Sequence, residues 1–115
     1  MQNMVYLIGR LAETPEVKDL DDDRKTLAIN IAVQRSYKNE DAVYETDFIR
    51  CVLWNAIAEH TAEYCKKGDL VGIKGRLQNR SYEDEDHNKK YITEVIVDKL
   101  SFLASKKEHD ITIES

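Results

Sequence analysis

The sequence predicts an all-β domain in which one helix lies between the third and fourth of five strands. Apolar and polar residues alternate along most of the segments that are rich in β-branched residues, and one stretch, after Asn55, has helical spacing instead. The 115 residues leave room for a single compact domain. We expect that domain to span residues 1–104 and to be followed by a short flexible tail over 105–115.

The first two strands are predicted from apolar runs. Residues 4–11 (MVYLIGRL) form the first run, and the region of Pro15 ends it. From Thr26 every second residue is apolar, which is typical of a half-buried strand whose core face is Leu27, Ile29, Ile31 and Val33. The polar residues 36–45 then predict a long hairpin connection.

The third strand, residues 46–54, alternates in the same way. Its predicted core face is Ile49, Cys51 and Leu53, and its other face carries Phe48, Arg50, Val52 and Trp54. A short helix is predicted next, with Asn55 as its N-cap and Lys66, Lys67 and Gly68 as its stop signal.

The fourth and fifth strands complete the domain. The fourth runs from Leu70 to Tyr82, with Val71, Ile73 and Leu77 toward the core, and residues 83–90 (EDEDHNKK) turn the chain. Residues 91–103 form the β-branched fifth strand. Three strands, a helix and two strands is the element order of the OB-fold, a partly open five-stranded barrel that often binds oligonucleotides.

Composition excludes several classes of protein. No apolar stretch approaches the roughly 20 residues that cross a membrane, and no export signal stands at the amino terminus, so we expect no membrane association and a cytoplasmic protein. Cys51 and Cys65 are expected to be buried, reduced thiols, and their spacing with His60 matches no zinc motif, so we expect neither a metal nor another cofactor. Because no nucleotide-binding, hydrolase or metalloprotease motif occurs, no enzymatic activity is expected.

The charge of the chain argues against a nucleic-acid partner at first sight. The formal net charge is −5 and the isoelectric point is near 5.2, whereas a nucleic-acid-binding domain is usually basic. The acids, however, gather in three probable turns, at 19–23, 40–47 and 83–86. Since a phosphate responds to the local field, the strands between these turns remain candidates.

Aromatic and cationic residues are interleaved on the outward faces of the third and fourth strands. This pattern suits unpaired nucleic acid, because rings stack on bases and cations contact phosphates. The residues concerned are Phe48, Arg50, Trp54, Lys74, Arg76, Arg80 and Tyr82, and Arg35 and Tyr37 repeat the pairing after the second strand. The alternative interpretation places the two rings of the third strand at the end of the core and the cations of the fourth on an ordinary solvated edge.

Four long stretches resemble the bacterial single-stranded DNA-binding proteins, especially those of low-GC Gram-positive bacteria and their phages. They are VYLIGRLAETPEV, AVQRSYKN, DFIRCVLWNAIAEHTAEYCKKGDLVGIKGRLQNRSY and YITEVIVDKLSFL. The resemblance implies an OB-fold, sequence-tolerant binding of single-stranded DNA in replication, recombination and repair, and a homotetramer. It also implies base stacking by Tyr37, Phe48, Trp54 and Tyr82 and phosphate contacts by Arg35, Arg50, Lys74, Arg76 and Arg80, with Arg10 as a lesser candidate.

Two stretches depart from the family pattern. Residues 17–26 (VKDLDDDRKT) are acidic where relatives commonly carry a basic and aromatic pair. The sequence ends in DITIES without the long linker and acidic tip through which typical members recruit replication and repair proteins, so that recruitment is in question. A short paralogue, a mobile-element version and a shortened form all fit this ending. Two other functions stay open: an OB-fold accessory factor that docks on replication proteins, and a metal-dependent nuclease.

Overall fold

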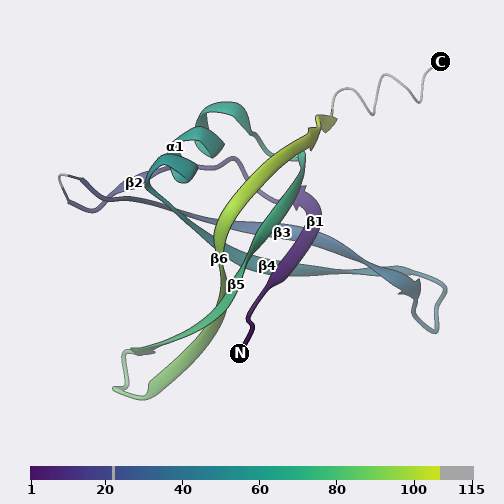
Figure 1. Cartoon of the computed structure of the whole chain (residues 1–115). Helices are drawn as coiled ribbons and strands as arrows, with labels where there is room; N and C mark the ends of the chain where they lie inside the picture. Colours follow the sequence, from purple (N-terminus) through teal and green to yellow (C-terminus); the bar gives the residue numbers. More distant parts are fainter. Residues whose placement is uncertain (22, 107–115) are drawn as a thin grey trace.

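The computed structural model of the protein, which describes residues 1–21 and 23–106, is a closed β-barrel with one helix at its end (Figure 1). Its hydrogen-bonded strand order is β1-β5-β6-β4-β3-β2, and β1 also pairs with β3. The elements are β1 (Val5–Leu11), β2 (Lys18–Asp19), β3 (Lys25–Lys38), β4 (Tyr44–Trp54), α1 (Asn55–Tyr64), β5 (Leu70–Glu83) and β6 (Lys89–Ala104).

The predicted OB-fold barrel is confirmed. The helix lies between β4 and β5, which are the third and fourth of the predicted strands, and the two-residue β2 is the added element. β2 pairs with β3 through Lys18↔Thr26 and Asp19↔Lys25, inside the acidic stretch that sequence analysis assigned to a turn. Most of the predicted tail, residues 107–115, lies outside the described residues.

The core is built from the alternate residues that the strand patterns predict. Leu27, Ile29 and Ile31 of β3 are almost completely buried, and so are their counterparts on β4, β5 and β6. Burying one such side chain contributes roughly 1.5–3 kcal/mol. Leu77 is the exception, because it lies where β5 leaves the barrel and is 49% exposed.

Two glycines allow the barrel to close. A Cβ at Gly9 would lie 2.4 Å from the carbonyl oxygen of Ala32, and one at Gly75 would lie 2.2 Å from that of Ile96. A side chain at either position would therefore separate β1 from β3 or β5 from β6. Close backbone approach explains both glycines, and it brings β1 against β3 at Arg10↔Ala32 and Leu11↔Ile31.

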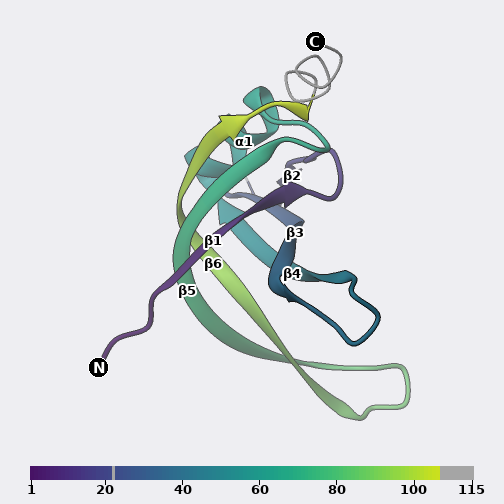
Figure 2. The ribbon, with the colours of Figure 1, turned by 90° about the vertical axis from the view of Figure 1, so that its right-hand side faces the viewer.

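Two β-ribbons project from the barrel, and both are longer than the sequence predicts (Figures 1 and 2). We call residues 35–46 the β3–β4 arm and residues 79–93 the β5–β6 arm. The tips share one design, in which Asn39 or Asp84 accepts two backbone N–H bonds through a side-chain oxygen. The fourth residue of each tip, Ala42 or His87, has a left-handed backbone.

The beginning of α1 corrects a prediction. The N-cap is Trp54, not Asn55, and it makes no side-chain capping bond. Asn55 has φ 52° and uses its side-chain oxygen to accept the backbone N–H of Lys25, so it ties the helix to β3 instead. In the described part of the chain, no helix is both long and apolar enough to cross a membrane.

Candidate nucleic-acid interface

The candidate interface lies on the outside of the barrel, across β4, β6 and β5. β6 lies between the other two, in parallel to β4 through Cys51↔Val95 and Val52↔Ile96 and antiparallel to β5. Outward-facing side chains of β4, β6 and β5 can therefore contact one another across three adjacent strands. We call this surface the outer face; its residues are Phe48, Arg50, Val52 and Trp54 of β4, Glu94, Ile96 and Asp98 of β6, and Arg76, Gln78, Arg80 and Tyr82 of β5.

The aromatic side chains that sequence analysis singled out are at the surface. Phe48 is 66% exposed, Trp54 39%, Tyr82 48% and Tyr37 64%. None of these four rings belongs to the buried core cluster. An exposed flat ring is available to stack on a base, whereas a buried ring would only pack.

A buried carboxylate joins two of the predicted phosphate contacts. Glu94 has a side chain that is 5% exposed, and its two oxygens accept the Nε–H groups of Arg50 at 3.0 Å and Arg80 at 3.1 Å. Within the described chain, neither arginine uses its Nη nitrogens in a hydrogen bond or ion pair. The carboxylate of Glu94 thus holds both arginines in place, while their Nη groups remain available to a ligand.

Other predicted cations have partners of their own. Arg76 pairs with Asp98 at 3.1 Å on the outer face, where both side chains are about half exposed. Arg10 donates through Nη1 to the carbonyl of Gly68 at 2.9 Å and lies in the cross-strand row of Ala32 and Phe48.

Lys74 lies apart from the outer face. Its Nζ is 6.0 Å from the centre of the Tyr6 ring, and both residues line a hollow formed by β1, β5 and β6. The structure therefore does not bring Lys74 together with Arg50 and Trp54.

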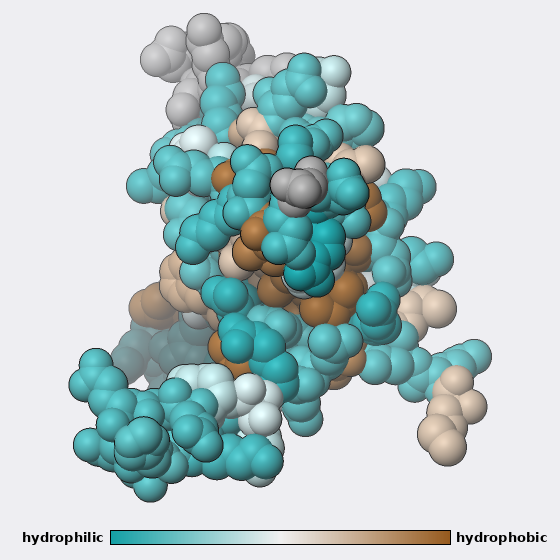
Figure 3. Space-filling model, turned by 90° about the vertical axis from the view of Figure 1, so that its left-hand side faces the viewer, coloured by the Kyte–Doolittle hydropathy of each residue, from teal (hydrophilic) through white to brown (hydrophobic). Residues whose placement is uncertain are grey.

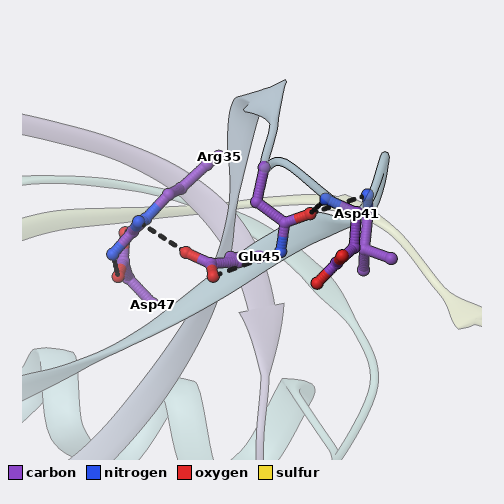
Figure 4. A network of polar contacts seen from close by, with 6 residues as sticks. Arg35, Asp41, Glu45 and Asp47 are labelled. Carbon is purple, nitrogen blue, oxygen red and sulfur yellow. Dashed lines mark hydrogen bonds and ion pairs between the residues drawn. The ribbon is translucent and has the colours of Figure 1, made fainter.

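Arg35 is held on the opposite side of the β3–β4 arm. It donates to both carboxylate oxygens of Asp47, at 2.9 and 3.1 Å, and to Glu45 at 2.7 Å (Figure 4). These contacts, led by the hydrogen bond to Asp47, raise the pKa of Arg35 above its ordinary value, and Tyr37 adds to the effect. The same hydrogen bond lowers the pKa of Asp47. Since Val33 and Asp47 are cross-strand partners, this network continues the core side of the strands, away from Phe48.

The structure thus groups six of the predicted residues on the outer face and separates four from them. Phe48, Arg50, Trp54, Arg76, Arg80 and Tyr82 share the face, while Arg35 and Tyr37, Lys74, and Arg10 lie elsewhere. Sequence analysis missed Glu94 and Asp98. The alternation within ITEVIVD was the available signal, because a Glu between β-branched residues calls for a cationic partner.

Hydrophobic side chains also reach the surface. Seen from the left-hand side of Figure 1, they gather in the middle of the molecule with hydrophilic residues around them (Figure 3). Tyr6 and Ile8 of β1 and Leu103 of β6 are among the exposed apolar residues. Apolar surface of this kind commonly marks a contact with a partner.

The two cysteines lie away from the outer face, in the core. Both are free and buried, and burial raises the pKa of Cys51 to about 12. A thiol with so high a pKa is protonated at neutral pH and is a poor nucleophile or metal ligand. In residues 1–21 and 23–106, no group of three or more His, Cys, Asp or Glu side chains is arranged to hold a metal ion.

Comparisons with a family model and with individual proteins both match this chain to single-stranded DNA-binding proteins. The model of the single-strand binding protein family matches residues 2–103. The chain is 42% identical over 106 residues to single-stranded DNA-binding protein B of Bacillus subtilis (strain 168), covering 92% of this chain and 94% of that protein. It is 44% identical over 107 residues to single-stranded DNA-binding protein 1 of Clostridium acetobutylicum, covering 92% and 97%. A third relative, single-stranded DNA-binding protein 1 of Lactococcus lactis (strain IL1403), is 42% identical and is covered over 71% of its length.

Proposed function

This chain belongs to the single-strand binding protein family, and from that premise we propose that it binds single-stranded DNA with little sequence preference. Its role would be to protect unpaired strands during replication, recombination and repair, by binding alone and without a chemical reaction. The observation that carries the proposal is the outer face, where exposed rings and open guanidinium forks lie on the same three strands.

The proposed mechanism divides the work between rings and cations. Phe48, Trp54 and Tyr82 stack on bases, each contributing roughly 1–3 kcal/mol, and stacking tolerates any base because every base has a flat face. Arg50 and Arg80 contact phosphates through their Nη groups, and Arg76 joins them by exchanging Asp98 for a phosphate.

The remaining predicted residues lie along the paths by which a longer strand would leave the outer face. Arg10 lies in the row of Phe48, Arg35 and Tyr37 lie on the other side of the β3–β4 arm, and Lys74 lies by the β1 hollow. We assign them secondary contacts. For Arg35 such a contact requires that a phosphate displace Glu45 or Asp47.

We also propose that copies of this chain assemble into a homotetramer. Over Val5–Gly9, β1 pairs with β5, and in the described chain β3 takes up the other edge of β1 only at Arg10 and Leu11. The remaining edge therefore offers unpaired N–H and C=O groups to another strand. The exposed side chains of Tyr6 and Ile8 on the same strand add apolar area to such a contact.

The experiment that tests the function is a comparison of three proteins binding a fluorescent oligo-dT, followed by anisotropy. Trp54→Ala should bind more weakly than the unaltered protein by roughly 1–3 kcal/mol, the value of one stacked base. Tyr64→Ala is the control, because Tyr64 is a 70% exposed tyrosine of α1 and belongs to none of the three strands that form the outer face.

Thermal unfolding should show that both variants are folded. Unaltered affinity in Trp54→Ala, or no binding of oligo-dT by the unaltered protein at low salt, would refute the proposed function.

A further inference from the structure

The β3–β4 arm carries an aromatic and cationic pair, Tyr44 and Lys38, within the stretch 36–45 that sequence analysis predicts to be a polar hairpin connection. Tyr44 and Lys38 are direct cross-strand partners at the point where β4 begins and β3 ends. The Nζ of Lys38 lies 5.4 Å from the centre of the Tyr44 ring, and the ring is 45% exposed. The pair lies on an arm that projects from the barrel (Figure 2), and Tyr44 is not among the residues that form the core or pack against it.

Tyr44 lies on the same side of β4 as Phe48. Residues four apart on a strand point the same way, and β4 is continuous from Tyr44 to Trp54. The irregularity in the pairing between Gln34 and Lys38 places its extra residues on β3, so it leaves the alternation of β4 intact. Tyr44 therefore continues the line of Trp54, Arg50 and Phe48, about 13 Å beyond Phe48 at the usual rise per residue.

Two acidic side chains of the arm and its base bind Arg35 and not Lys38, which lies over the Tyr44 ring. The nearby carboxylates of Glu45 and Asp47 bind Arg35 on the other side of the arm. Glu45 also accepts a bond from Asn39, whose side chain fixes the tip. Glu45 and Asp47 are thus directed away from the side that carries Lys38 and Tyr44.

We propose that Tyr44 and Lys38 form an additional stacking and phosphate site for single-stranded DNA, which extends the outer face along the β3–β4 arm. A base stacks on the exposed side of the Tyr44 ring, and Lys38 contacts the phosphate beside it. This inference rests on the proposed function, and it predicts that the site serves strands long enough to pass beyond Phe48.

The test compares two lengths of oligo-dT, roughly 6 and roughly 30 nucleotides, because OB folds occupy about 4–16 nucleotides each. Tyr44→Ala should bind the long oligonucleotide about fivefold or more weakly, the lower value for one stacked base, and the short one nearly unchanged. Tyr44→Phe keeps the ring and should bind both as the unaltered protein does. Lys38→Gln should lower the slope of log affinity against log salt by about 0.7, as expected for one lost phosphate contact.

Tyr64→Ala again serves as the control, since it removes an exposed tyrosine from α1 rather than from the β3–β4 arm. Unaltered long-strand affinity in Tyr44→Ala, with Trp54→Ala weakened, would overturn this inference and leave the proposed function standing. If the unaltered protein bound neither oligonucleotide, the proposed function would fail and this inference with it.

Discussion

Glu94 is the residue on which the geometry of the outer face depends most. Its side chain is almost fully buried, and it accepts one bond from each of two arginines that come from different strands. A buried carboxylate is tolerated only when it is paired, and here the pairing also fixes where the two guanidinium groups point.

We expect Glu94→Ala to lower the free energy of unfolding by about 1–3 kcal/mol, because it leaves Arg50 and Arg80 without their shared acceptor. The expected loss is below that of a fully buried pair, since both arginines are about 40% exposed. Urea unfolding measures it. Glu85→Ala, an exposed change at the tip of the β5–β6 arm, is the control. Equal stability of the two variants would show that Glu94 is not a structural link.

For single residues, the sequence predicted the exposure of a side chain better than it predicted the residue with which that side chain pairs. Alternation along the third strand separated Phe48 and Trp54 from Cys51 and Leu53, and the burial of these residues confirms that separation. The pairing of Arg50 and Arg80 with Glu94 depends on β6 lying between β4 and β5. That neighbourhood is a property of the topology, and no periodicity within one strand encodes it.

The two arms are the elements that extend the candidate interface beyond the barrel. Each is a two-stranded ribbon with almost entirely exposed side chains, so its stability comes from backbone pairing and from its tip. In the β3–β4 arm the side-chain oxygen of Asn39 accepts the N–H groups of Asp41 at 2.9 Å and Val43 at 3.0 Å.

Asn39→Ala should lower the free energy of unfolding by about 1 kcal/mol, because two exposed hydrogen bonds of the tip are lost. Glu40→Ala, in the same loop, should have almost no effect, and urea unfolding of the two variants provides the comparison. If Asn39→Ala matched Glu40→Ala, the tip would not depend on this side chain.

The sequence predicted the number and order of the main elements but not their lengths or ends. Residues 36–45 are predicted to be a polar connection, yet residues 36–38 belong to β3 and residues 44–45 to β4, with Lys38 opposite Tyr44, because a ribbon exposed on both sides needs no apolar alternation. Asn55 read as an N-cap, yet its side chain binds the backbone of Lys25, a residue that only the folded chain brings near. Tertiary contacts decided both cases.

The whole molecule is acidic, and its predicted DNA-contacting arginines are largely neutralised by its own carboxylates. Asp47, Glu45, Glu94 and Asp98 each pair with an arginine of the candidate interface or the neighbouring arm. Local fields rather than net charge therefore have to attract the phosphates. Where a phosphate must displace a carboxylate, as at Arg35 and Arg76, the contact is expected to contribute less than at Arg50 and Arg80.

The proposed homotetramer can be tested by measuring the mass of the protein in solution. Size-exclusion chromatography with light scattering should give four times the mass of the 13.3 kDa chain for the proposed homotetramer. Tyr6→Asp should lower that mass, because it places a charge beside the free edge of β1. A monomeric mass for the unaltered protein at micromolar concentration would refute the tetramer.

The central claim is that the outer face of β4, β6 and β5 is where single-stranded DNA binds. Trp54 lies on that face and is the only tryptophan of the chain, so its fluorescence reports on the face directly. Titration with oligo-dT at low salt should quench the emission to saturation, and added salt should restore it as phosphate contacts are lost. Binding detected by anisotropy with no change in the emission of Trp54 would contradict the claim, because the strand would then lie elsewhere on the protein.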